Sequence, residues 1–259
     1  MLCPMYNKQT YIIAVTAIIL ALMLQQAITG AKTRDVTTNP DTYFLKAEDV
    51  ADALQLLPAP PEPDSVAFQL DAAMYQQGMT LRNSPAGERA AEDAANTPEQ
   101  NAMTFSKAFG LAISPDTTPA ILALARRVMG DAGSLATRAA KKAYARPRPF
   151  VFYGTATCKP SAQGEVHPRH SYPSGHSASG WALALVLSEI NPKRQNEILR
   201  RGLELGQGRV ICGYHWQSDV DAGRIVAAAV VARLHANDTF VQELAAAKEE
   251  FARLQQKQR

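Results

Sequence analysis

The chain has 259 residues, 46% of them hydrophobic, which is enough for one or two domains with a well-buried core, and we favour one. Its 27 basic and 24 acidic residues give a formal net charge of +3 and are spread along the chain. A nucleic acid polymer is therefore not indicated as a partner, because proteins that bind one usually carry clustered Lys and Arg.

The first 31 residues have the layout of a secretory signal peptide. Lys8 precedes an apolar run from Tyr11 to Leu24, and small residues follow up to Ala31. The run of 14 residues is shorter than the roughly 20 that a membrane-spanning helix needs, so an uncleaved anchor is the weaker interpretation. We expect cleavage near Ala31, export to the periplasm, and no stable membrane insertion after cleavage.

Cysteine usage fits this expectation. Cys3 would leave with the signal peptide, while Cys158 and Cys212 would remain as an even pair. In an oxidising compartment such a pair is expected to form a disulfide, and the alternative is two buried free thiols.

Residues 32–64 are expected to form an N-terminal lead-in. Helical spacing of apolar residues predicts a helix over 45–57, and the proline-rich stretch 58–63 ends it and favours an extended polyproline segment on the core. The helical domain itself is expected to occupy 65–259.

Nearly every segment of that domain has a helical pattern, and no convincing strand is found. The expected helices cover 66–82, 87–96, 120–129, 134–145, 177–190, 191–206, 220–236 and 238–255. Thr118 and Asp238 are predicted N-caps. The almost wholly apolar face of 222–233 predicts that this helix is central. The predicted fold class is all-α, a single-domain helical bundle.

Three segments carry polar residues where a bundle would otherwise have apolar residues or plain surface. In the first, Lys141 and Arg148 are expected two turns apart near the same face of a helix that Pro149 terminates. Two such cations could bind one anion, and Arg matches phosphate oxygens bidentately. Basic residues are also common in a solvated last helical turn, so this segment alone is weak evidence.

The second segment is Pro173-Ser-Gly-His176, at the mouth of an apolar helix. Unpaired backbone N–H groups of Gly175 and His176 can point at an anion there, and the Ser174 hydroxyl adds a donor. His176 can protonate a leaving group. The competing interpretation is an ordinary helix cap with an exposed His.

The third segment runs from Gly208 to Asp219. His215 and Asp219 are four residues apart, so on a helical turn the carboxylate can accept the Nδ1–H and leave Nε2 unprotonated. A neutral imidazole in that orientation is a nucleophile toward phosphorus, and Arg209 adds a third cation for the phosphate oxygens.

A metal site is the alternative interpretation of these segments. The candidate ligands are His167, His170, His176, His215 and Asp219. This interpretation is the weaker one, because no HExxH or paired-Cys spacing is present and three nearby cations would repel a divalent metal.

Together the segments resemble the three-part motif of the type 2 phosphatidic acid phosphatase (PAP2) superfamily, Lys-x6-Arg-Pro, Pro-Ser-Gly-His and Arg-x5-His-x3-Asp. The flanking residues, GDAGSLATRAAKKAYARPRPF from Gly130 and RVICGYHWQSDVDAGR from Arg209, are similar to the class A bacterial non-specific acid phosphatases. The resemblance covers about residues 43–251.

The resemblance implies a PAP2/haloperoxidase-type bundle and an acid phosphatase that hydrolyses small-molecule phosphate monoesters through a phosphohistidine, with no metal or other cofactor. It implies phosphate binding by Lys141, Arg148, Ser174, Gly175 and Arg209. His215 would be the nucleophile, Asp219 its orienting partner, and His176 the acid for the leaving group. An acidic optimum is expected, because His176 protonates more readily below its reference pKa of about 6.5. The family is also expected to carry a disulfide at Cys158 and Cys212.

One departure from the family is Gly208, which stands where Ser usually precedes the Arg. The missing hydroxyl puts rate and phosphate affinity in doubt, but not the reaction class. Phosphotransfer to another alcohol is an expected side activity.

Several alternatives remain at this stage. They are a nucleotide-preferring apyrase or nucleotidase, a membrane lipid phosphatase, a vanadium haloperoxidase-type oxidoreductase, and a non-catalytic phosphate-binding protein. Apolar helices could also bury the interface of a homo-oligomer, but the periodicity does not separate such a face from core.

Overall fold

The computed structural model describes residues 42–257, so the expected signal peptide lies outside the described part of the chain. The described residues form helices and no strand, which confirms the all-α fold class. The elements are α2 (Ala53–Leu56), α3 (Val66–Thr80), α4 (Pro85–Ala95), α5 (Pro98–Met103), α6 (Ser106–Phe109), α7 (Pro119–Gly130), the π-helix η1 (Asp131–Leu135), α8 (Arg138–Tyr144), α9 (Pro149–Phe152), α10 (Pro160–Gln163), α11 (Gly175–Ile190), the 3-10 helix η2 (Pro192–Arg194), α12 (Gln195–Ile211), α13 (Gln217–Leu234) and α14 (Asp238–Lys257).

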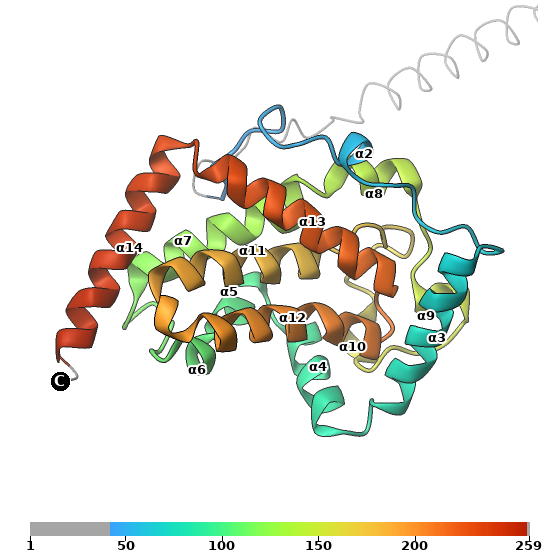
Figure 1. Cartoon of the computed structure of the whole chain (residues 1–259). Helices are drawn as coiled ribbons and strands as arrows, with labels where there is room; N and C mark the ends of the chain where they lie inside the picture. Colours follow the sequence, from blue (N-terminus) through green and yellow to red (C-terminus); the bar gives the residue numbers. More distant parts are fainter. Residues whose placement is uncertain (1–41, 258–259) are drawn as a thin grey trace, which may run out of the picture. The chain divides into compact units, whose positions relative to one another are not determined.

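Helix α11 lies at the centre of the bundle. It packs between α12 and α13 and also contacts α7 and α14 (Figure 1). Its apolar side chains are buried on several sides, as Leu183 and Val186 show. The prediction that 222–233 is the central helix is wrong, because α13 packs one face on α11 and leaves Ile225 47% exposed. Ala residues, which made that segment look buried all round, suit both buried and exposed positions of a helix.

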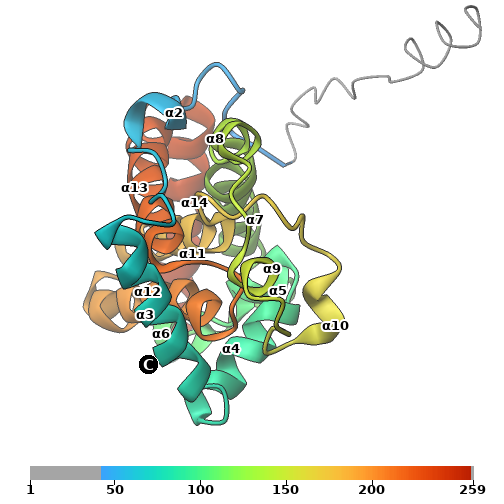
Figure 2. The ribbon, with the colours of Figure 1, turned by 90° about the vertical axis from the view of Figure 1, so that its right-hand side faces the viewer.

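The lead-in follows the surface of the bundle. The predicted helix over 45–57 is wrong except for α2, which lies beside α8 (Figure 2). The backbone N–H groups of Phe44 and Leu45 donate to the Asp131 carboxylate at 3.0 and 3.2 Å, and both side chains join the main core. These long-range bonds satisfy the backbone without a helix. Further on, the Pro58 carbonyl accepts a bond of 2.8 Å from the Tyr172 hydroxyl.

One of the two predicted N-caps is confirmed in position and the other is wrong. Thr118 is the N-cap residue of α7, with Pro119 at the first helical position, but its side chain makes no capping bond. Instead the Glu250 carboxylate of α14 accepts bonds from the N–H groups of Ala120 and Ile121, at 3.1 and 3.0 Å. At the start of α14 the cap is Asn237, whose Oδ1 accepts from Phe240 N at 2.9 Å, rather than Asp238. Contacts between distant helices decided the first case, and such contacts cannot be read from local sequence.

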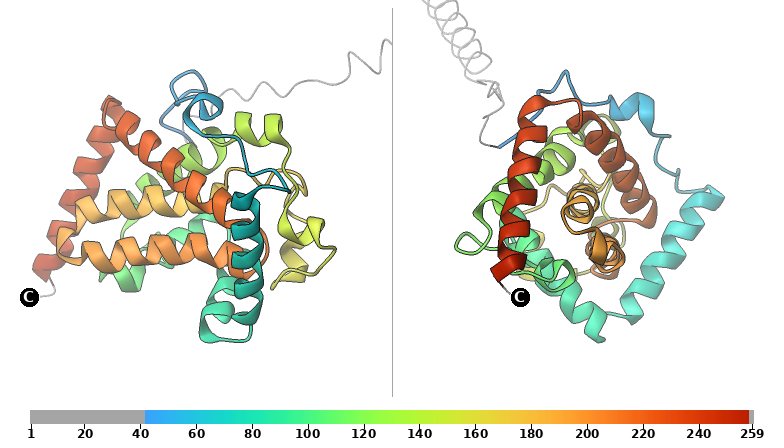
Figure 3. Two further views of the ribbon diagram at one scale, coloured as in Figure 1. Left: turned by 45° about the vertical axis from the view of Figure 1, so that its right-hand side comes forward. Right: turned by 60° about the vertical axis from the view of Figure 1, so that its left-hand side comes forward.

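Helices α3 and α4 pack against α12 at one end of the bundle, where the elements that carry the three motif segments also begin or end (Figure 3). Helix α12 runs to Ile211, five residues beyond the predicted end, and α13 begins at Gln217, three residues before the predicted start. The short connection between these two helices contains His215.

Candidate active site

The three motif segments meet around a cavity of about 240 Å³. The predicted site residues that line it are Lys141, Arg148, Gly175, His176 and His215. The other predicted residues, Ser174, Arg209 and Asp219, are buried and do not line it. A larger cavity of about 460 Å³ between α4, α6 and α12 contains none of the motif residues.

The orientation of His215 is determined by a partner on each ring nitrogen. Nδ1 lies 3.3 Å from Asp219 Oδ2, and Nε2 lies 2.8 Å from Arg148 Nη1. Because a guanidinium can only donate, Nε2 must be the acceptor and Nδ1 carries the proton. Burial and the charges of Arg148 and Arg209 hold the pKa of His215 well below its ordinary value. The imidazole is therefore neutral, with its lone pair at the cavity.

Asp219 is wholly buried in the first turn of α13. Its Oδ2 accepts bonds from Ser171 Oγ at 2.5 Å and from Trp216 N at 2.8 Å, in addition to the contact with His215. Its Oδ1 accepts a bond of 2.6 Å from Arg146 Nη1. Every partner is a donor, so these bonds hold the carboxylate in one orientation.

Lys141 and Arg148 come together in a way that differs from the prediction. Helix α8 ends at Tyr144 and is followed by the C-cap Ala145, whose φ of 43° is left-handed, and Pro149 opens α9 instead of terminating a longer helix. The two cations therefore meet across a loop rather than on one helix face. Lys141 Nζ donates to the Pro173 carbonyl. Arg148 donates to carbonyls of the loop before α11, including that of His170 at 3.0 Å.

Arg209, on α12, is 2% exposed, and its Nε and Nη1 have no hydrogen-bond partner among residues 42–257. Its guanidinium lies over the Tyr214 ring, 4.0 Å from the ring centre. Buried donors without a partner are costly, so they indicate a ligand that accepts hydrogen bonds. Charges of Arg209, Arg148 and Lys141 all act on His176, and this concentration of positive charge suits an anion.

The second motif segment serves the start of α11. Ser174 Oγ accepts bonds from Ser177 N at 3.3 Å and Ser177 Oγ at 2.9 Å, so it is the N-cap of the helix. Gly175 follows as the first helical residue, and a Cβ there would lie 2.6 Å from the Gly133 carbonyl oxygen. Glycine is therefore needed for the close approach of α11 to η1.

His176 lies in the first turn of α11 at the cavity wall. Burial and the charges of Arg209, His215, Arg148 and Lys141 hold its pKa well below the ordinary value. Burial and these cations therefore disfavour the protonated form of His176 as long as no anion is bound. A bound anion would offset the neighbouring cations and raise this pKa again.

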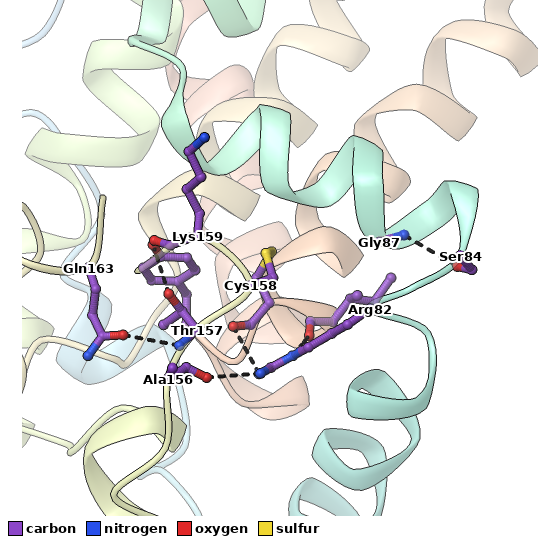
Figure 4. The surroundings of a disulfide bond; sticks show 11 residues. Arg82, Ser84, Gly87, Ala156, Thr157, Cys158, Lys159 and Gln163 are labelled. Carbon is purple, nitrogen blue, oxygen red and sulfur yellow. Dashed lines mark hydrogen bonds between the residues drawn. A yellow bond between two sulfur atoms is a disulfide. The ribbon is translucent and has the colours of Figure 1, made fainter. Parts of the chain in front are cut away.

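The predicted disulfide between Cys158 and Cys212 is confirmed, with a Cα–Cα distance of 4.5 Å. Arg82 joins the same two segments (Figure 4). Its Nε donates to Ile211 O at 2.9 Å and its Nη1 donates to Ala156 O at 2.9 Å. Both constraints act at the end of α12, three residues before His215. They restrict the conformations open to the connection that carries this imidazole.

Comparison with known proteins agrees with this arrangement. Residues 119–240 match the family model described as the PAP2 superfamily. A non-specific acid phosphatase of Providencia stuartii is 56% identical over 85% of this chain and 89% of its own length. One from Salmonella typhimurium is 44% identical over 80% of this chain and 83% of its own. An acid phosphatase of Zymomonas mobilis is 30% identical over 92% and 88%, respectively.

The chain belongs to the PAP2 superfamily. Within it, the chain is similar to bacterial non-specific acid phosphatases and is itself an acid phosphatase, a phosphoric monoester hydrolase. Among the described residues of this phosphatase, no three His, Cys, Asp or Glu side chains form a group that could hold a metal ion. No helix within 42–257 is both long and apolar enough to cross a membrane.

Sequence reasoning missed one wall of the phosphatase cavity, which Gly133 and Ser134 of η1 and the residues around α5 form. The available signal was Gly133 itself, because a glycine inside a helical pattern often marks a close approach. Asn96 and Asn101 also line the cavity. They carry no comparable signal, since an isolated Asn between helices is equally typical of a cap or turn.

Gly208 packs α12 against α4 and is not among the residues that line the cavity. A Cβ there would lie 3.2 Å from Ala90 Cβ. We expect Gly208→Ser to change KM for an aryl phosphate by less than about twofold and to act mainly on stability, by about 1 kcal/mol or less. A gain in helix propensity opposes the tight contact in that variant. Steady-state kinetics and thermal unfolding check this, and a tenfold change in KM would contradict it.

Proposed function

We propose that this acid phosphatase transfers the phosphoryl group of a phosphate monoester to Nε2 of His215 and then to water, without a metal ion. The observation that carries the proposal is the position of the Nε2 lone pair, which faces Arg148 at the cavity wall. A bound phosphate oxygen can take the place of His215 as the acceptor for Arg148 and leave the lone pair free to attack phosphorus.

In the first step, a bond forms between Nε2 and phosphorus while the ester P–O bond breaks. Lys141 and Arg148 at the cavity wall, and the buried Arg209 behind it, would bind the oxygens on which charge accumulates. Asp219 accepts the hydrogen bond from Nδ1–H of His215 and stabilises the positive charge that develops on this imidazole ring. His176, protonated in the complex with the anionic substrate, gives its proton to the leaving oxygen.

In the second step, water attacks phosphorus and transfers a proton to the now neutral His176. The P–N bond breaks, and its electron pair returns to Nε2. Inorganic phosphate then leaves. An alcohol that replaces water would take the phosphoryl group, so phosphotransfer is proposed as a side activity. Broad specificity is proposed because the motif residues contact only the phosphate.

We also propose that residues 1–31 are removed on export and that the mature enzyme acts in the periplasm. This proposal rests on the apolar run at residues 11–24 and on the disulfide, which is typical of an oxidising compartment. N-terminal sequencing of the exported protein is the test, and a sequence that still begins at Met1 would contradict it.

The test of metal independence is hydrolysis of an aryl phosphate by purified enzyme in excess EDTA. We expect activity within about twofold of the untreated enzyme, because three fixed cations already provide the charge that a metal would contribute. Loss of activity that Zn²⁺ or Mg²⁺ restores would refute the proposed mechanism.

A pH dependence follows from Lys141. Burial and the charge of Arg148 lower the pKa of Lys141 to about 7, so in the free enzyme the side chain is a cation below that pH and neutral above it. Anion binding should weaken as the pH rises through 7, and KM for an aryl phosphate should rise by up to about tenfold per pH unit. KM measured across pH 5 to 9 checks this.

Lys141→Arg is the matched variant, because a guanidinium stays charged over that range. In this variant the rise in KM should shift to higher pH. An unchanged profile would show that another group causes the dependence.

A further inference from the structure

Behind His215 and Asp219 lies a second buried ion pair that the reaction described above does not use. Arg146 is 6% exposed and Asp71, on α3, is 2% exposed. Arg146 Nη2 donates to Asp71 Oδ2 at 2.7 Å, while its Nη1 donates to Asp219 Oδ1 at 2.6 Å. One guanidinium therefore bridges two carboxylates, only one of which contacts His215.

Asp71 is held as firmly as Asp219. Its Oδ1 accepts a bond of 2.8 Å from Ser218 N, and its Oδ2 accepts one of 2.6 Å from Ser218 Oγ. Ser218 Oγ in turn accepts a bond of 2.8 Å from Arg146 Nη1. Asp71 thus binds the first turn of α13 and Arg146 at once, which fixes the guanidinium relative to Asp219.

The bond from Arg146 also determines which Asp219 oxygen faces the imidazole. Arg146 is the partner of Oδ1, and Oδ2 is left for Ser171, Trp216 and His215. A buried cation at this distance withdraws part of the negative charge that would otherwise attract the Nδ1 proton. Asp71 competes for that cation and limits the withdrawal.

We propose that Arg146 and Asp71 are positioning residues that set how strongly Asp219 stabilises a positive charge on His215. The inference rests on the proposed function, in which that charge develops during phosphoryl transfer. The pair makes the imidazole less basic than a lone Asp219 would, so that His215 stays an unprotonated nucleophile at acidic pH. Charged groups that face His215 are Lys141 of α8, Arg148, His176 of α11, Arg209 of α12 and Asp219 of α13, with Arg146 and Asp71 behind Asp219.

The test measures kcat/KM for an aryl phosphate in two variants from about pH 3 to about pH 8. The acid limb of this profile, where kcat/KM falls as the pH decreases, reports the protonation of His215. In Asp71→Asn, Arg146 keeps only Asp219, so His215 should become less basic and the limb should move to lower pH by about half a unit. In Arg146→Gln with Asp71→Asn, the pair is removed without changing the summed charge. Asp219 then acts on His215 unopposed, and the limb should move to higher pH by about half a unit to one unit.

The matched control is Arg127→Gln with Glu243→Gln, which removes a half-buried pair between α7 and α14 that the catalytic groups do not contact. It should lower stability and leave the limb in place. If Asp71→Asn and the double variant lose activity in parallel at every pH, the role of the pair is only structural and the inference is wrong. The inference is also wrong if the acid limbs of the two variants move in the same direction. Either variant decides the point alone if the other does not fold.

The two proposals can fail separately. Absence of an acid-labile, base-stable phosphoenzyme in the wild type would refute the phosphohistidine intermediate. The limb would still report protonation of His215 in whatever role it has, because that residue faces the reacting position. If the wild type forms the phosphoenzyme but the acid limbs of the two variants do not move, only the inference about Arg146 and Asp71 is refuted.

Discussion

His215→Ala is expected to lower kcat for an aryl phosphate by at least about 10⁴-fold, because Nε2 of His215 is the acceptor that faces Arg148 at the cavity wall and the proposed nucleophile. Loss of the proposed nucleophile would remove the covalent route altogether. The remaining cations should still bind phosphate, so affinity for inorganic phosphate should change far less than kcat. Steady-state rates and competitive inhibition by phosphate measure the two effects.

An aryl phosphate that is radiolabelled on phosphorus tests directly for the covalent intermediate. Wild-type enzyme quenched during turnover should carry an acid-labile phosphoryl group that His215→Ala lacks. His235→Ala is the matched control, because this exposed imidazole pairs with Glu189 on the surface, away from the cavity. It should keep both rate and labelling. Wild-type rates in His215→Ala would rule out His215 as the nucleophile.

Asp219→Asn is expected to lower kcat by about 10⁴-fold. The same loss is seen when the Asp of a Ser-His-Asp triad becomes Asn, because the histidine then takes the wrong tautomer. The buried carboxylate accepts bonds from Arg146, Ser171, Trp216 N and His215. An amide has one acceptor oxygen, so in either orientation its NH₂ group faces a donor. We therefore also expect a loss of about 2 to 4 kcal/mol in the free energy of unfolding.

The control for this variant is Asp221→Asn, two residues further along α13. Asp221 is exposed and pairs with Arg224 at 3.0 Å, so its loss should change kcat by less than about twofold. Urea unfolding and steady-state rates of both variants are the measurements. Equal effects of the two substitutions would show that Asp219 has no special function.

The motif spacings predicted five residues that line the cavity, namely Lys141, Arg148, Gly175, His176 and His215. The pair His215 and Asp219 is separated by one helical turn, and Gly175 with His176 begins a helix, so local geometry alone places a carboxylate against an imidazole and frees two N–H groups. Helical periodicity likewise predicted the all-α class and most helices from residue 66 onward, because apolar spacing reflects the buried face of each helix directly.

Other features depended on contacts between segments far apart in the sequence. The capping of α7 by Glu250, the capture of Phe44 and Leu45 by Asp131, and the bridge from Arg146 to Asp71 join residues separated by 75 to 130 positions. Such contacts leave no periodic trace, since a charged residue such as Glu250 or Asp71 looks in the sequence like any other charged residue of a helix.

The sequence by itself therefore determined the fold class, the family and the residues of the three motifs. Only the tertiary structure decided how they are arranged: Lys141 and Arg148 meet across a loop, Ser174 caps a helix, and burial together with nearby cations lowers the pKa of both His176 and His215. The physical reason is that motif residues act through local spacing, whereas burial and electrostatic coupling depend on which distant groups share the same low-dielectric interior.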